Sequence, residues 1–118
     1  MSYDISFKVK IKGTETYYDT AYCHANITWN VRKIIELSTG LEWINEANNG
    51  LCADIIPKIE KGLLELEYNA KKYKKYEDKD GWGTVDGTKR FFAEILDDWE
   101  EFVSDYPELK YVATFWIE

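Results

Sequence analysis

The stretch DISFKVKIK, residues 4–12, alternates polar and apolar side chains without a break and constrains the arrangement of the rest of the chain. An alternation of period two predicts a β-strand with one apolar face and one solvated face. We therefore expect helices to cover the face that carries Phe7. The opposite face, with Lys8, Lys10 and Lys12, is expected to stay open.

Two further strands are expected to flank this one. Gly13 begins a turn, and Thr16–Cys23 is expected to return as the second strand of a hairpin. Lys110–Glu118 carries aromatic bulk on both faces, which predicts a strand inside the sheet. We expect this last strand to pair antiparallel with residues 4–12, so that the sheet order is second, first, last.

Helices are predicted between the hairpin and the last strand, from apolar spacing and capping residues. They run from Asn26 or Thr28 to Gly40, over Ala53–Tyr68, over Ala70–Tyr76 and over Thr84–Ser104, with a loop at Leu41–Gly50. Gly62 falls on or beside a buried stripe, which indicates close approach by another element. The prediction is a single α+β domain over residues 1–118, in the order β-β-α-α-(α)-α-β, with helices packed on one face of a small antiparallel sheet.

The composition limits the classes of protein to which this chain can belong. The chain has 118 residues, 45% of them hydrophobic, and a net charge of −7. No apolar run is long enough to cross a bilayer, and Met1–Lys12 lacks the layout of a signal peptide, so we expect a cytoplasmic protein without a membrane partner. The excess of acidic over basic residues argues against direct nucleic-acid binding. Cys23 and Cys52 are expected to be free, buried thiols.

The sequence offers few catalytic candidates. His24, the single histidine, follows Cys23 directly, and neighbours on a strand point to opposite faces, so the two cannot act as a nucleophile and its base. One histidine and two separated cysteines do not make a zinc site. We therefore expect neither enzymatic activity nor a cofactor or metal.

Two motifs are candidates for binding a small ligand. One is Asp80-Gly81-Trp82-Gly83-Thr84-Val85-Asp86-Gly87, and the other is Asn26-Ile27-Thr28-Trp29-Asn30-Val31. A structural interpretation makes the first a turn with a tryptophan anchor and a helix cap at Thr84, and the second a strand-to-helix turn. A functional interpretation makes them a polar pocket for a small ligand or nucleotide. The residues of that pocket would be Asn26, Trp29, Asn30, Trp82 and Asp86.

Charge is spread unevenly along the chain. From Phe91 to Leu109 there is no lysine or arginine, whereas Lys71–Lys79 is rich in lysine. The acidic segment is either a solvated helix face or a surface for a basic partner protein. Its candidate partner-binding residues are Glu94, Asp97, Asp98, Glu100, Glu101 and Asp105.

Three segments together resemble a known group of proteins. They are Asn26-Ile27-Thr28-Trp29-Asn30-Val31, Ile56-Pro57-Lys58-Ile59-Glu60-Lys61-Gly62 and Gly81-Trp82-Gly83-Thr84-Val85-Asp86-Gly87. The chain resembles, over Ala25–Glu118, small functionally uncharacterised proteins of bacteria, their phages and mobile elements. That group commonly has asparagine where Asp80 stands here. The resemblance implies a phage or mobile-element context and binding to a host component, and it brings no catalytic role.

These observations lead to one expected function and one alternative. We expect a non-enzymatic, stoichiometric inhibitor of a bacterial defence or nucleic-acid enzyme, comparable to anti-CRISPR proteins, acting in the host cytoplasm on a bacterial protein with a basic surface. The alternative is a small-ligand or nucleotide-binding domain that uses the two motifs above. The oligomeric state is left open, a homodimer included.

Overall fold

The central element of the fold is β1, and the computed structural model describes it together with the whole of residues 1–118. β1 (Ser2–Lys10) pairs antiparallel with β2 (Tyr17–Asp19), β3 (Asn26–Thr28) and β4 (Thr114–Ile117). On one edge of β1, the Thr20 amide donates to the Phe7 carbonyl and the Ile5 amide donates to the Ala25 carbonyl. On the other edge, the Asp4 amide donates to the Glu118 carbonyl. The sheet order from the sequence, with residues 4–12 between the second and last strands, is confirmed.

The second strand is shorter than predicted, and a third one follows it. Thr16–Cys23 was expected to be a continuous strand, but β2 ends at Asp19 because Ala21 turns the chain with a φ of 60°. The Asp19 carboxylate stabilises this turn by accepting the Ala21 amide at 2.8 Å. The chain then returns to β1 as β3, where Tyr3 pairs with Ile27. The predicted helix start at Asn26 is therefore wrong, because main-chain pairing with β1 holds this segment extended.

Helices fill the middle of the chain. They are a 3-10 turn at Trp29–Val31, α1 (Arg32–Thr39), a π-helical turn at Trp43–Ala47, α2 (Cys52–Tyr68), α3 (Ala70–Lys74), α4 (Val85–Asp105) and a 3-10 turn at Pro107–Leu109. α1 ends at Gly40, which adopts a left-handed φ of 76°, and α4 begins after Thr84, whose hydroxyl accepts the Gly87 amide at 2.9 Å. The α+β class is confirmed, in the order β-β-β-α-α-α-α-β.

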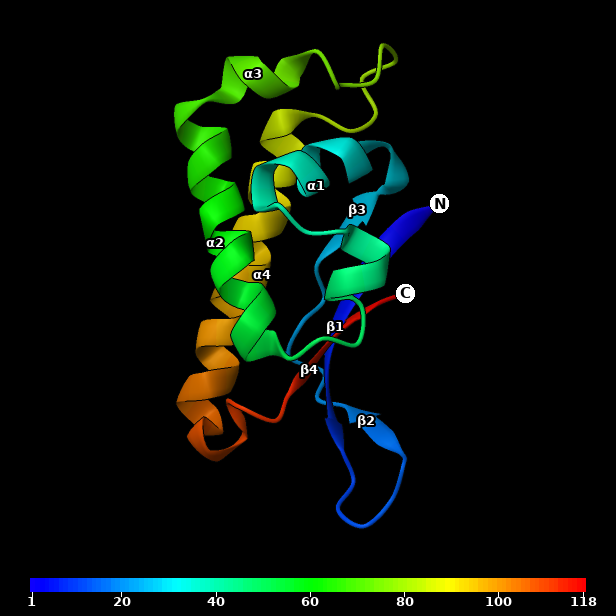
Figure 1. The fold of residues 1–118 in the computed structure, drawn as a ribbon, viewed down its shortest axis with the longest axis vertical. Coiled ribbons are helices and arrows are strands. Elements are labelled where there is room, and N and C mark those ends of the chain that lie inside the picture. Colours follow the sequence, from blue (N-terminus) through cyan, green and yellow to red (C-terminus); the bar gives the residue numbers. More distant parts are fainter.

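The helices cover the Phe7 face of the sheet, and α2 and α4 lie side by side (Figure 1). Phe7 is fully buried, with its ring centroid 5.3 Å from that of Trp99 on α4. α1 and α4 both approach α2 at Gly62. A Cβ atom there would lie 2.7 Å from Thr39 Cγ2 and 3.0 Å from Phe92 Cε2. The close approach predicted from Gly62 is therefore confirmed.

The last strand begins later than predicted. β4 starts at Thr114 rather than at Lys110, because the chain first makes the turn at Pro107–Leu109 and leaves Tyr111 exposed. The molecule is elongated, 47 × 26 × 20 Å, and the hairpin between β1 and β2 forms one end of its long axis (Figure 1). None of its helices is both long and apolar enough to cross a membrane.

Candidate functional site

The acidic residues predicted as a partner site lie on the solvent side of α4. They are Glu94, Asp97, Asp98, Glu100, Glu101 and Asp105, of which Asp98 is half-buried and the others are exposed. Residues three or four apart share a face of a helix. Glu94, Asp98, Glu101 and Asp105 therefore form one stripe, which we call the acidic stripe. Asp97 and Glu100 lie beside it, further round the helix.

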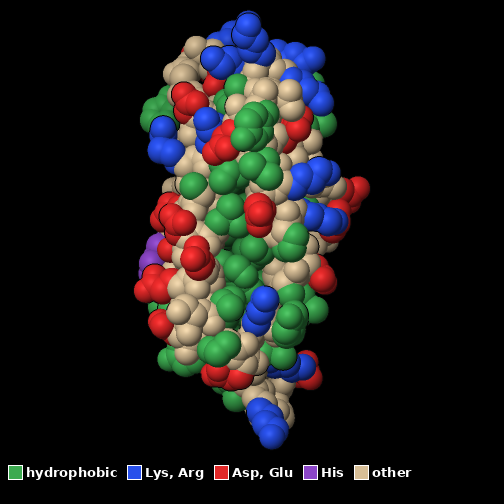
Figure 2. All heavy atoms as spheres, turned by 90° about the vertical axis from the view of Figure 1, so that its left-hand side faces the viewer, with side chains coloured by type: hydrophobic (Ala, Val, Ile, Leu, Met, Phe, Trp, Pro, Cys, Tyr) green, Lys and Arg blue, Asp and Glu red, His purple; other side chains and the backbone are tan.

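No basic side chain neutralises these carboxylates within the molecule. The ion pairs of the structure are Lys8–Glu118, Lys10–Glu15, Arg32–Glu36, Lys58–Glu46 and Lys72–Glu65, and none involves α4. Figure 2 shows carboxylates along one side of the molecule beside the single histidine, and lysine and arginine side chains at the upper end, over α3. The negative charge of α4 is therefore separated in space from the lysine-rich segment.

The loop between β2 and β3 borders the acidic stripe. The Tyr22 hydroxyl donates to the Asp105 carboxylate at 2.7 Å, and the His24 amide donates to Asp98 at 3.4 Å. Tyr22, His24, Asp98 and Glu101 line a shallow hollow of about 380 Å³. The bond to Asp105 raises the pKa of Tyr22 to about 12. The structure thus adds Tyr22 and His24 to the predicted site.

The two cysteines carry no reactive thiol. Both are free and buried, as predicted. Burial raises the pKa of Cys23 to about 12, and burial also raises the pKa of Cys52. Cys23 is buried whereas His24 is exposed, so the two side chains point apart, which agrees with the argument against a nucleophile–base pair.

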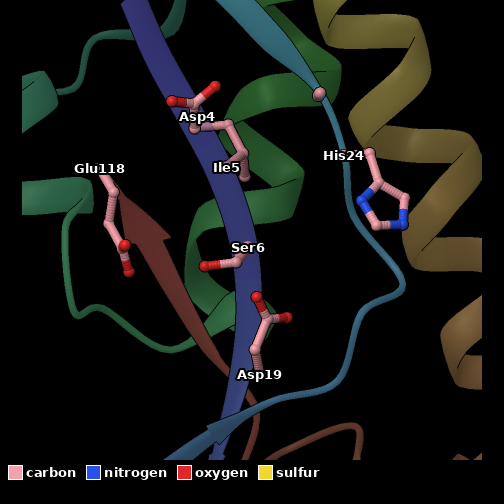
Figure 3. Close-up of a pocket in the computed structure, with 7 residues that line it drawn as sticks. Asp4, Ile5, Ser6, Asp19, His24 and Glu118 are labelled. Carbon is pink, nitrogen blue, oxygen red and sulfur yellow. The ribbon is translucent and has the colours of Figure 1, made fainter.

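A second group of carboxylates lies on the open face of the sheet. Asp4, Asp19 and Glu118 line a hollow of about 240 Å³ with Ser6, and His24 is set apart on the loop that faces α4 (Figure 3). Asp4 accepts a hydrogen bond from the Asn26 amide group, and Glu118 pairs with Lys8. No cluster of histidine, cysteine and carboxylate side chains in the structure could hold a metal ion. The Asp4 and Glu118 carboxylates are thus bound by other side chains, and the group forms no metal site.

The two motifs of the alternative ligand pocket touch each other, since a Cβ atom on Gly83 would lie 3.0 Å from Asn30 Cβ, but they do not line a common hollow. Asn26 is in β3 and Asn30 is in the following 3-10 turn. Asn30 donates to Asp78 at 2.8 Å and Trp29 donates to the Ser2 carbonyl at 2.9 Å. Trp82 is 67% exposed.

Asp86 lies in the first turn of α4, behind the Thr84 cap, as the sequence indicated. None of the hollows of the structure is lined by Trp29, Asn30, Trp82 or Asp86. The structure therefore shows no enclosed pocket at these two motifs.

Sequence reasoning had no signal for Tyr22 and His24 as neighbours of α4. Tyr22 is separated from Asp105 by 83 positions, and the turn at Ala21 that brings the loop to α4 involves no glycine or proline. In comparisons with known proteins, no protein-family model, no curated protein and no solved structure matches this chain.

Proposed function

We propose that this protein is a non-enzymatic binding protein that attaches to a basic surface of a partner protein through α4. The observation that carries the proposal is the complete lack of ion pairs along the acidic stripe, although Lys and Arg side chains pair with carboxylates elsewhere on the molecule. Like charges held close together repel one another in the free protein, and a basic partner relieves that repulsion.

The geometry of the stripe suits a rigid recognition surface. Its four carboxylates project from a regular helix that packs on α2 and on the sheet, so little ordering is needed on binding. Tyr22 and His24 add an aromatic ring and an imidazole at its edge. Aromatic side chains are enriched in protein interfaces.

A nucleic-acid enzyme is the partner class that fits this charge best. Such enzymes hold phosphates in clefts lined with lysine and arginine, and a row of carboxylates competes for the same cations. We propose that the protein occupies such a cleft in a bacterial defence or nucleic-acid enzyme and inhibits it stoichiometrically. The motif resemblance proposed from the sequence would imply a phage or mobile-element context and so a place of action in the host cytoplasm.

The experiment compares two charge-matched triple variants. Glu94→Gln, Asp97→Asn and Glu101→Gln neutralise α4, and Glu60→Gln, Asp54→Asn and Glu67→Gln neutralise exposed positions of α2. Each immobilised protein is exposed to bacterial lysate, and a captured enzyme is purified and assayed with each of the three proteins. We expect the α4 variant to bind about tenfold or more weakly and the α2 variant to bind like the parent.

The parent is also expected to inhibit at a one-to-one ratio and to lose affinity as salt rises. Three results would each overturn the proposal. They are equal binding by both variants, binding that does not depend on salt, and failure to capture any enzyme at moderate salt.

A further inference from the structure

A hollow of about 500 Å³ lies where β1 extends past the first residue of β4. It is mostly apolar, and its walls include Leu51, Tyr111 and Val112. Tyr111 is 71% exposed and Val112 51% exposed, which is unusual for large apolar side chains gathered in one place. Contiguous exposed apolar surface of this kind marks an interaction site.

The hollow also contains an open strand edge. In an antiparallel pair, alternate residues direct their main-chain groups to the same neighbour. On β1, the main-chain groups of Asp4, Ser6 and Lys8 point toward β4. The main-chain groups of Lys10, the next residue in this series, point in the same direction. Pairing with β4 stops at Lys8 and Thr114.

The chain itself does not continue the pairing between β1 and β4 as far as Lys10. The position opposite Lys10 would be Val112, but the Val112 amide donates to the Leu109 carbonyl at 3.1 Å, inside the turn that precedes β4. The main-chain groups of Lys10 therefore face the hollow without a strand beside them. The outer edge of β4, by contrast, is covered, since the Phe115 amide donates to Gly50 and the Cys52 amide donates to Ala113.

The charge at this hollow is opposite to that of the molecule as a whole. Lys10 and Lys12 line it, and the Lys110 ammonium lies 5.4 Å from the centre of the Tyr111 ring at its wall. Among these lysines only Lys10 has an acidic partner, the exposed Glu15 at 3.0 Å. An occupant of this hollow must offer apolar side chains to its walls and carboxylates to its rim.

We infer that an extended acidic segment of a partner protein binds here as an added strand, pairing with the main chain of Lys10 and directing apolar side chains against Leu51, Tyr111 and Val112. Main-chain pairing supplies affinity in such strand addition, and pockets for alternate side chains supply specificity. The acidic stripe takes no part in this contact, so the hollow is a second site, independent of the function proposed for α4.

The test uses a short capped peptide that alternates glutamate and valine. Two control peptides accompany it, one with lysine in place of glutamate and one with every main-chain amide N-methylated. Amide hydrogen exchange is followed by NMR in the intact protein. We expect the glutamate peptide to slow exchange of the Lys10 amide by about tenfold or more, and neither control peptide to do so.

Two variants test whether the peptide binds in the hollow rather than anywhere on the surface. The residues that they replace are exposed to a similar extent. Val112→Asp places a carboxylate in the hollow, and Leu64→Asp does so at a position of α2 that is 48% exposed and outside it. Thermal unfolding first establishes that both variants keep the parent's cooperative transition. We expect Val112→Asp to weaken peptide binding by about tenfold and Leu64→Asp to leave it unchanged.

Several results would overturn the inference. One is binding of the glutamate peptide without protection of the Lys10 amide, and another is equal binding of the N-methylated or lysine peptide. A third is sedimentation of the free protein as a dimer that Val112→Asp dissociates, since the occupant would then be a second copy of this chain. No detectable binding at millimolar peptide would also overturn it.

Discussion

The Tyr22 hydroxyl donates a hydrogen bond of 2.7 Å to the Asp105 carboxylate and so joins the loop between β2 and β3 to the last turn of α4. This bond holds the loop against the helix that carries the acidic stripe. It also fixes a phenol next to a carboxylate, which changes how the phenol titrates.

The Tyr22 hydroxyl is expected to ionise at a higher pH than the hydroxyl of an ordinary tyrosine. The bond to Asp105 raises its pKa from 10.0 to about 12, since ionisation would remove the proton that the hydroxyl donates and would place two negative charges together. Because the pKa is higher in the folded protein, the contribution of this group to stability is complete below pH 10.0 and is lost as the pH rises toward about 12. Ultraviolet titration of the parent against Tyr22→Phe measures this group directly, and a difference spectrum centred near pH 10 would contradict the prediction.

Gly62→Ala is expected to destabilise the protein although alanine favours helices. The propensity gain is about 1 kcal/mol, whereas overpacking costs about 1–3 kcal/mol. The new Cβ would lie 2.7 Å from Thr39 Cγ2. Urea unfolding should show a net loss of about 1 kcal/mol in the free energy of unfolding.

Thr39→Ser provides the matched control for this site. Serine keeps the hydroxyl that donates to the Ile35 carbonyl at 2.7 Å and removes the methyl group that the alanine would meet. In the Thr39→Ser background, Gly62→Ala should therefore cost less than in the parent. A single Gly62→Ala variant more stable than the parent would show that α1 moves aside freely.

The thiols are expected to resist modification while the protein is folded. Burial raises the pKa of Cys23 to about 12, so almost no thiolate is present at pH 8, and reagent has no access to the buried sulfur atoms. An Ellman assay at pH 8 should show no reaction in buffer and two thiols per chain in denaturing urea. Rapid reaction of either cysteine in buffer would contradict the burial seen here.

Deletion of residues 111–118 is expected to abolish cooperative unfolding. It removes β4, and with it Phe115, which is fully buried against Trp43 and Phe7. Loss of a buried phenylalanine alone costs about 3–5 kcal/mol, a large part of the stability of a small domain. Glu118→Gln, which keeps β4, serves as the control, and a truncated chain with a transition near that of the control would contradict the role assigned to β4.

The sheet and the long helices could be predicted because their patterns are long. The alternation over residues 4–12 is unbroken, and α4 repeats apolar residues along its whole length. β3 could not be predicted, since three residues are too few to show a period and both Asn26 and Thr28 are common helix caps. Only pairing with Ser2–Asp4, far away in the sequence, makes this segment a strand.

Part of the candidate site could likewise be predicted from the sequence, and part of it could not. The acidic residues of α4 were predicted because they cluster in one segment that contains no lysine or arginine and that reads as a helix. Their lack of ion pairs could not be predicted, because it depends on where the lysines of other elements lie. The hollow at Lys10 was also beyond the sequence, since Lys110–Glu118 looks like one continuous strand and gives no sign that pairing stops at Thr114.

The pairing of β1 with β4 also bears on how the protein folds in the cell. Lys8 and Glu118 are 110 positions apart, and β1 gains its β4 neighbour only after Ile117 has left the ribosome. Synthesis of this length takes on the order of ten seconds, during which an apolar strand with an open edge is exposed. Until residues 114–117 have been synthesised, this edge of β1 is therefore open to pairing with other chains.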